Sequence, residues 1–215
     1  MLIIEKSPKS IAAESYRTLR TNIKYSSFDK EMKRILFTSS IPGEGKSTTA
    51  SNIALAFAQE EKKVIIIDCD LRRSHVHKEF NVSNRTGLTN VLISKEDLNK
   101  HIQNYNKYLD ILTAGVVPPN PSEMLSSKAM SDLLDKLDKE YDVIIIDSPP
   151  VKAVTDAQIL SRIVDGVVLV VRSGFSKKEA VLETKSEIEK VGGKIIGTVL
   201  NRAEGTREKY YYYYG

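Results

Sequence analysis

The sequence is poor in cysteine, in tryptophan and in long apolar segments. Its single cysteine, Cys69, excludes a disulfide framework, a four-thiolate zinc site and an iron–sulfur cluster held within the chain, and it favours a reducing compartment. The longest uninterrupted apolar run, Ile53–Ala58, is far shorter than the roughly 20 residues that a membrane-spanning helix needs. Glu5 and Lys6 follow directly after Met1–Ile4, so no signal peptide is expected. We therefore expect a cytoplasmic protein.

The sequence also lacks a strong charge of either sign. Its 215 residues include 32 Lys and Arg and 28 Asp and Glu, which gives a formal net charge of +4. Such a mild excess does not indicate nucleic acid as a partner, and none is expected. The hydrophobic share of 41% is ordinary for a globular protein, and the chain is long enough to bury a core without covalent cross-links.

Short apolar runs rich in Val and Ile alternate with helical stretches along the chain. Because the stronger runs do not alternate with polar residues, they are typical of strands buried on both faces of a parallel sheet. Strands are predicted at Ile35–Phe37, Val64–Ile67, Leu109–Thr113, Val143–Ile146, Val167–Val171 and Lys194–Leu200, and helices at Ser47–Glu60, Ser122–Lys139, Asp156–Ile163 and Lys177–Val191. This alternation predicts an α/β fold with a doubly wound, mostly parallel sheet. We expect one domain over residues 1–202, including an N-terminal helix at about residues 10–25, and a tail at 203–215.

The segment Ser39–Thr48 reads Ser-Ser-Ile-Pro-Gly-Glu-Gly-Lys-Ser-Thr and lies between the first predicted strand and a helix. In that context it predicts a P-loop NTPase fold, although Ser40 stands where the strict Walker A pattern has Gly. The glycines let successive backbone N–H groups turn towards an anion, and the helix N-terminus adds its dipole. We expect ATP to bind here, with Lys46 on the β- and γ-phosphates. The predicted nucleotide-binding residues of the loop are Gly43, Glu44, Gly45, Lys46, Ser47 and Thr48.

Three aspartates follow buried strands, at the edge of the sheet where such folds bind their ligands. Asp147 is the predicted Walker B acid, and with Ser47 it is expected to hold Mg²⁺. Asp68 and Asp70 are two residues apart, so on an extended chain both carboxylates point the same way, towards the γ-phosphate. The predicted catalytic residues are Lys46, Asp68, Asp70 and Asp147, and the predicted Mg²⁺ ligands are Ser47, Asp70 and Asp147.

The two acids after the second strand allow more than one role. Asp68 is our candidate for the base that accepts the proton of an attacking hydroxyl, but the sequence leaves open which of Asp68 and Asp70 serves. The alternative is that both acids pair with Arg72 and Arg73 and only tie a loop.

The Walker A segment and Asp68-Cys69-Asp70-Leu71-Arg72 together resemble the bacterial tyrosine kinases of capsule and exopolysaccharide operons, which carry Walker A, A′ and B motifs. Pro118–Met124 is similar to the family's Pro-Pro-Asn-Pro-Ser-Glu-Leu segment, with Met in place of Leu. The family's Glu-x-x-Arg-x-x-Arg spacing and C-terminal tyrosine cluster are also matched. The residues that match them are Glu14, Arg17 and Arg20, and Tyr210, Tyr211, Tyr212, Tyr213 and Tyr214.

This resemblance implies an ATP- and Mg²⁺-dependent protein tyrosine kinase that autophosphorylates its C-terminal cluster in trans, phosphorylates other protein substrates and regulates polysaccharide synthesis. It implies that the Glu14–Arg20 stripe lies at the subunit interface of a homo-oligomeric ring; the alternative is a solvated stripe. A membrane adaptor whose cytoplasmic tail activates the kinase, and a cognate tyrosine phosphatase, are the implied partners. The kinase would then be recruited peripherally to the inner face of the cell membrane.

Asn201 and the Pro-rich segment also have structural interpretations. Asn201 follows the last predicted strand, where related P-loop proteins contact adenine, but an Asn there can also cap a turn. In the Pro-rich segment, Asn120 is expected to cap a helix that has Pro121 in its first turn.

The nearest rival function is a partitioning or division-site ATPase with the same fold. Those proteins carry a signature lysine in Lys-Gly-Gly-x-Gly-Lys, and the corresponding positions here are Ile41 and Pro42. A non-catalytic, nucleotide-sensing regulator would need Lys46 and Ser47 but would have no need of the acids after the second strand.

Overall fold

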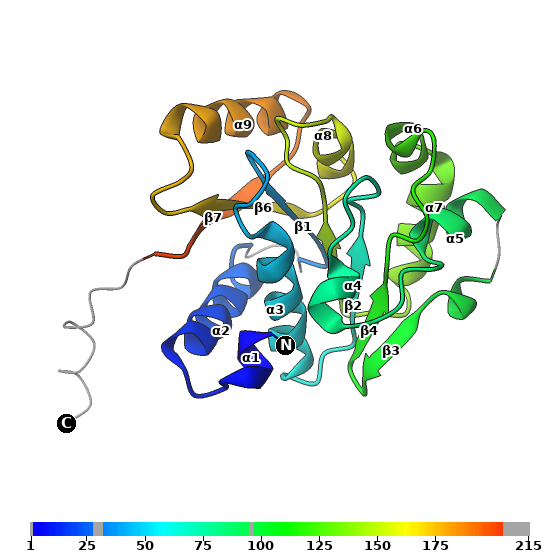
Figure 1. Cartoon of the computed structure of the whole chain (residues 1–215), viewed down its shortest axis with the longest axis horizontal. Coiled ribbons are helices and arrows are strands. Elements are labelled where there is room, and N and C mark those ends of the chain that lie inside the picture. Colours follow the sequence, from blue (N-terminus) through cyan, green and yellow to red (C-terminus); the bar gives the residue numbers. More distant parts are fainter. Residues whose placement is uncertain (1, 28–31, 95–96, 204–215) are drawn as a thin grey trace.

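The computed structural model describes residues 2–27, 32–94 and 97–203, and within them seven strands form one sheet. The strand order is β3-β4-β2-β5-β1-β6-β7, and only β3 runs antiparallel to its neighbour (Figure 1). The strands are β1 (Arg34–Ser39), β2 (Val64–Asp68), β3 (Gln103–Asn106), β4 (Leu109–Leu112), β5 (Val143–Asp147), β6 (Gly166–Arg172) and β7 (Ile195–Asn201). The prediction of a mostly parallel, doubly wound α/β fold is therefore confirmed.

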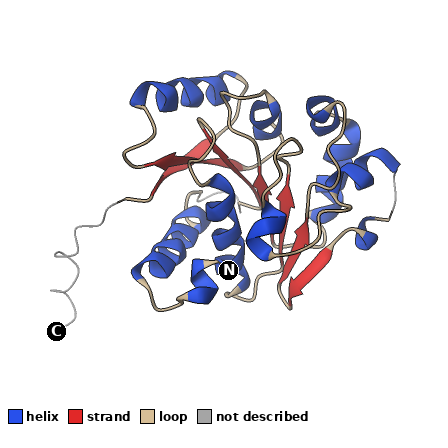
Figure 2. Ribbon diagram, viewed as in Figure 1, coloured by secondary structure: helices blue, strands red, loops and turns tan. Residues whose placement is uncertain are grey.

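Helices cover both faces of the sheet, which is the red layer of Figure 2. One face packs against α1 (Ile3–Lys6), α2 (Ile11–Lys24), α3 (Lys46–Ala58) and α4 (Val76–Phe80). The other face packs against α5 (Leu88–Ser94), α6 (Pro121–Leu125), α7 (Lys128–Leu137), α8 (Asp156–Ser161) and α9 (Lys178–Lys190). Successive strand residues alternate between these two cores, so Leu36 lies in one and Ile35 and Phe37 in the other. No helix of the described ranges is long and apolar enough to cross a membrane.

The predicted helix at Ser122–Lys139 is wrong in one respect, because the structure has two helices there. α6 ends at Leu125, and Ser127 then starts α7 by accepting a hydrogen bond from the backbone N–H of Met130. Asn120 stands at the predicted cap position with Pro121 in the first turn, but its side chain makes no cap bond and instead donates to the Glu123 carboxylate.

Residues 76–94 and 97–106 contain elements that the sequence analysis did not predict, among them α4, α5 and β3. The helices have only five and seven residues, too few to show a helical repeat. β3 reads Gln-Asn-Tyr-Asn and pairs only with β4 at the edge of the sheet, so it carries no apolar run. In the described residues, these short elements are therefore stabilised more by tertiary packing than by the helix or strand propensity of their own residues.

Candidate active site

The phosphate loop joins the end of β1 to the start of α3 and contains two glycines with left-handed backbone. Gly43 has φ +86° and Gly45 has φ +93°, a region that favours glycine over every residue with a Cβ. Gly45 is the N-cap of α3, so the first amides of this buried helix face the loop. A Cβ on Gly45 would also overlap the side-chain amide of Asn201. The loop therefore has the shape of an anion site, with the first amides of α3 directed towards it.

Lys46 begins α3 and brings its charge among acids that come from two other strands. Its side chain is buried, and Nζ lies 3.2 Å from Asp70 Oδ2, 3.5 Å from Asp147 Oδ1 and 3.2 Å from Ser47 Oγ. Burial lowers the pKa of Lys46, but the charges of Asp147, Asp70 and Asp68 outweigh burial and raise this pKa above its ordinary value. The ammonium is therefore fixed in its charged form at the end of the phosphate loop.

Asp147 is the last residue of β5. This strand lies between β1, which leads into the phosphate loop, and β2, which ends at Asp68. Its register partners are Phe37 of β1 and Asp68 of β2. The carboxyl group is fully buried, and Oδ2 has no hydrogen-bond partner in the described part of the chain. Burial raises the pKa of Asp147, and the charge of Lys46 opposes that shift. A buried carboxylate oxygen without a hydrogen-bond partner is costly, and a cation bound to it would supply the partner.

Asp68 is held by the backbone that follows it. Its Oδ2 accepts from the amides of His75 (2.9 Å) and Val76 (3.0 Å), and its Oδ1 accepts from the amide of Asp70 (3.1 Å). Burial and the charge of Asp147 raise the pKa of Asp68 to about 7, although the Val76 amide and Lys46 lower it. Asp68 therefore binds the first backbone amides of α4, and its raised pKa makes it a weak acid at the carboxyl end of β2.

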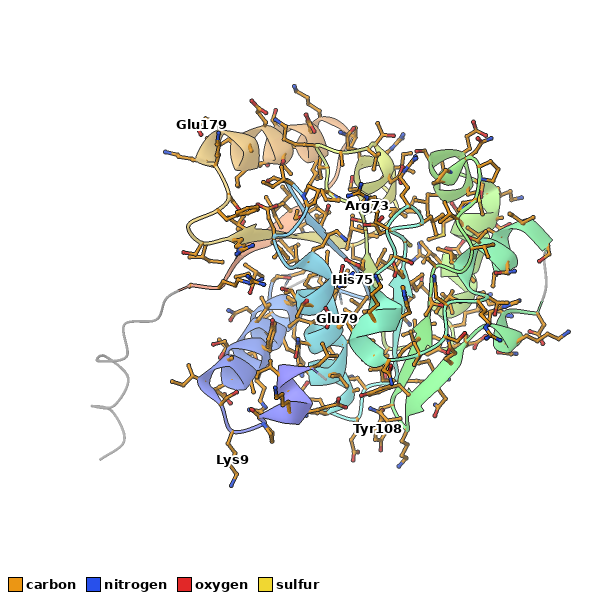
Figure 3. All side chains as sticks on the ribbon, in the orientation of Figure 1. Lys9, Arg73, His75, Glu79, Tyr108 and Glu179 are labelled. Carbon is orange, nitrogen blue, oxygen red and sulfur yellow. The ribbon has the colours of Figure 1, made fainter. Side chains whose placement is uncertain are left out.

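Asp70 lies beyond the end of β2, where the chain turns. Its Oδ2 contacts Lys46, and its Oδ1 accepts from the amide of Arg73 at 2.9 Å. Asp68 and Asp70 accept from different amides, and the charges of both raise the pKa of Lys46. That both carboxylates point towards the γ-phosphate stays a prediction. The acids do tie a loop, but through backbone amides instead of the side chains of Arg72 and Arg73. In Figure 3, Arg73, His75 and Glu79 mark this loop and α4 beside the start of α3.

The side chains of Glu44 and Thr48, both predicted to bind the nucleotide, contact protein groups. The buried Glu44 carboxylate accepts from the Ile41 amide at 2.9 Å and from the Ser176 hydroxyl. Thr48 Oγ1 donates to Glu79 at 2.6 Å. Asn201 Nδ2 donates to the Glu44 carbonyl at 2.9 Å. The phosphate loop is therefore held in place by contacts within itself, with α4 and with β7.

The donor set at the end of β5 fits Mg²⁺, which prefers oxygen ligands and commonly uses one or two carboxylates together with phosphates. Ser47, Asp70 and Asp147 supply those oxygens, and the buried Asp147 Oδ2, which has no hydrogen-bond partner in the described residues, fits the role of a Mg²⁺ ligand best. Within the described ranges, no three His, Cys, Asp or Glu side chains form a metal cluster by themselves. Phosphate oxygens would have to complete the coordination.

The stripe on α2 lies away from this site. Arg17 pairs with Glu14 at 2.9 Å and donates to the Pro8 carbonyl. Arg20 binds the Ala56 carbonyl and Glu60, at the end of α3 opposite the phosphate loop. The five tyrosines, Tyr210 to Tyr214, lie outside the described residues.

Asp156 and Ser122, which have no predicted role in chemistry, lie next to the loop of residues 69–75 that follows β2, named here the Walker A′ loop. Asp156 at the start of α8 is fully buried and forms an ion pair with Arg72, and both contact Ser122 of the Pro-rich segment. Ser122 belongs to the Pro-rich segment Pro118–Met124, which the sequence predicts to start a helix. Asp156 gave no signal beyond its place at a helix start, because its partners are distant in the sequence.

A family model described as an AAA domain matches residues 32–195. The tyrosine-protein kinase YwqD of Bacillus subtilis is 46% identical over 215 residues, covering 100% of this chain and 91% of the relative. The chain belongs to the bacterial tyrosine kinases. The kinase superposes on the kinase domain of Escherichia coli tyrosine kinase ETK with a TM-score of 0.88 and 37% identity, covering 94% of this chain and 82% of that one. The chimerical protein CapA2B2 gives a TM-score of 0.89 and 42% identity, over 94% and 89% of the two chains.

Replacing Asp68 by Asn is expected to change how the stability of the kinase depends on pH. The pKa of Asp68 is about 7 in the folded protein and roughly 3.9 in the unfolded chain, so its contribution to stability is present at low pH and is lost as the pH rises through about 7. Between pH 5 and 8, the unfolding free energy of Asp68→Asn should fall by about 2–3 kcal/mol less than that of the wild type. Urea unfolding across this range measures it.

The control for this prediction is Asp132→Asn, because Asp132 is an exposed acid on α7. Its pH curve should coincide with that of the wild type. If the curve of Asp68→Asn runs parallel to the wild type, burial does not raise the pKa of Asp68.

Proposed function

We propose that this kinase transfers the γ-phosphoryl group of ATP to its own C-terminal tyrosines in trans and to other proteins, and thereby regulates capsular or exopolysaccharide synthesis. The observation that carries the proposal is the Lys46 ammonium held between Asp70 and Asp147 at the end of the phosphate loop. Phosphoryl transfer needs mostly positioning and charge neutralisation, and this cluster of one cation and buried acids is suited to both.

Each group of the site receives a role in this proposal. The amides of residues 43–48 and the Lys46 ammonium hold the phosphates, and Ser47, Asp70 and Asp147 hold Mg²⁺. Bound Mg²⁺ would neutralise charge on the phosphates. Asp68 accepts the proton of the attacking phenol, whose ordinary pKa is about 10. We favour Asp68 over Asp70 because the Lys46 ammonium already occupies Asp70 Oδ2.

Asn201 remains our candidate for the adenine contact. Its side chain is fixed beside Gly45 by the bond to the Glu44 carbonyl, so it lies at the β7 side of the phosphate loop. Lys46 and Asp70 lie towards β2, the opposite direction in the sheet. A nucleotide whose phosphates occupy the loop would therefore have its base near β7.

The proposed assembly is a ring, with Glu14, Arg17 and Arg20 at the subunit interface. Glu14 is 68% exposed and Arg17 28%, so both can contact a neighbouring subunit, whereas Arg20 is 13% exposed and already binds α3. A membrane adaptor would activate the kinase through its cytoplasmic tail, and a tyrosine phosphatase would remove the phosphates. The kinase would then work in the cytoplasm, at the inner face of the membrane.

Mixing two variants tests transfer in trans. Lys46→Met keeps all five tyrosines but loses the phosphate-binding ammonium, and a variant with Tyr210–Tyr214 replaced by Phe keeps the active site but loses the acceptors. We expect mass spectrometry to find phosphate on the tail of Lys46→Met only after incubation with the second variant, ATP, Mg²⁺ and the adaptor.

Each variant incubated alone is the control and should stay unmodified at residues 210–214. A modified wild-type tail with an unmodified mixture would contradict transfer in trans. An unmodified wild-type tail together with measurable ATP hydrolysis would contradict the tail as acceptor.

A further inference from the structure

Three side chains from separate parts of the sequence form a closed triangle beside the Walker A′ loop. Ser122 Oγ donates to Asp156 Oδ1 at 2.5 Å, Arg72 Nη2 donates to Ser122 Oγ at 3.1 Å, and Arg72 Nε lies 3.4 Å from Asp156 Oδ2. The residues come from the loop after β2, from α6 and from α8. Three sequence-distant groups that bond one another pairwise hold one another in place.

The burial of Asp156 makes this triangle costly to break. Its side chain is 0% exposed, whereas Arg72 is 41% exposed, so Asp156 depends on these two partners to compensate a buried charge. α6 packs against α8, which fixes the distance between Ser122 and Asp156. α8 in turn follows the loop between Asp147 and Asp156, whose Val151 amide donates to the Ser39 carbonyl at the start of the phosphate loop.

The triangle reaches the site through a single peptide bond. The amide that donates to Asp70 Oδ1 at 2.9 Å is that of Arg73, and this N–H belongs to the peptide group joining Arg72 to Arg73. Fixing the side chain of Arg72 therefore restricts the peptide that orients Asp70. Asp70 Oδ2 in turn contacts the Lys46 ammonium at 3.2 Å.

We propose that Ser122 and Asp156 are positioning residues for Asp70, and that they act through Arg72. The Pro-rich segment then does more than start a helix, since Pro121 and the first turn of α6 place the Ser122 hydroxyl on Asp156. This inference rests on the proposed role of Asp70 as a Mg²⁺ ligand, but the geometry of the triangle does not depend on it. Residues that orient a ligand in this way typically affect activity by about 10- to 100-fold.

Hydrogen exchange of the Arg73 amide tests the positioning without any nucleotide. In Ser122→Ala, this amide should exchange about tenfold faster than in the wild type, while the amides of His75 and Val76, which bind Asp68, keep their protection. Ser122→Thr retains a hydroxyl and should restore the protection. Ser126→Ala is the matched control, because Ser126 follows α6 and its hydroxyl donates to the Glu123 carbonyl of the same helix.

Phosphotyrosine formation supplies the second measurement. For Ser122→Ala and Asp156→Asn we expect kcat to fall by about 10- to 100-fold while the KM for ATP changes by less than about threefold, because the phosphate loop is untouched. In an Arg72→Ala background, Ser122→Ala should have no further effect on kcat, since the proposed route is already broken. Asp156 is buried and its variant can fail to fold, so Ser122→Ala decides the result.

Unchanged protection of the Arg73 amide in Ser122→Ala would overturn the proposal. So would an equal loss of protection in Ser126→Ala, or a further drop of kcat in the Arg72→Ala background. If Asp70→Asn retains full phosphoryl transfer, the proposed role of Asp70 fails, and loss of Arg73 protection in Ser122→Ala would still support the positioning.

Discussion

Replacing Lys46 by Met is expected to lower the rate of phosphotyrosine formation by at least about a hundredfold, as loss of a preorganised charge at a transferring group generally does. The side chain is nearly isosteric, so the loop keeps its shape, but the ammonium that now contacts Asp70 and Asp147 is gone. Quantitative phosphotyrosine detection with saturating ATP measures the effect. A rate close to that of the wild type would contradict our assignment of Lys46.

The same variant should be less stable, by about 3 kcal/mol at pH 8. Removal of the cation leaves Asp147 and Asp70 buried without their partner, and because Lys46 no longer lowers it, the folded-state pKa of Asp147 rises further, so stability is lost as the pH rises. The loss should therefore be smaller at pH 5. Lys178→Met, at an exposed position on α9, is the control and should change neither rate nor stability.

Replacing Gly45 by Ala is expected to destabilise the kinase by about 3 kcal/mol and to abolish nucleotide binding. A left-handed backbone costs a residue with a Cβ about 1–2 kcal/mol, and the new methyl group would overlap the Asn201 side chain, which adds about 1–3 kcal/mol. Moving Asn201 also breaks its bond to the Glu44 carbonyl. Urea unfolding and calorimetric titration with ADP measure the two effects.

Gly43→Ala is the matched control, since Gly43 has a similar φ but its Cβ would meet only the Phe175 ring at 4.0 Å. Gly43→Ala should be destabilised only by the cost of a left-handed backbone, about 1–2 kcal/mol. In an Asn201→Ala background the difference between the two glycine variants should nearly vanish. Equal destabilisation of both variants in the wild-type background would show that Asn201 does not restrict the loop.

Much of the site could be predicted because it consists of consecutive residues. The glycines at 43 and 45, the lysine after them and the helix that follows form a local structure whose backbone angles and amide directions depend on neighbours in the sequence. Asp68 and Asp147 were likewise predictable as the ends of buried strands, since four apolar residues before an acid indicate a strand edge.

Other parts of the site depend on which strands are neighbours. The order β2-β5-β1 places Asp147 beside Asp68, and this pairing is one cause of the raised pKa of Asp68. Nothing local to either strand indicates that order. The buried direction of the Glu44 side chain likewise depends on Ser176, a residue 132 positions away.

Residue spacing alone was enough to predict the class of fold, the phosphate loop and the acids at the strand ends, since these depend on near neighbours in the sequence. Three contacts could be seen only in the folded chain: Asp70 with Lys46, Asp68 with the start of α4, and Arg72 with residues 50 and 84 positions away. The physical reason is that contacts between distant residues depend on how all the strands and helices pack together. The spacing of residues along the chain gives no information about that packing.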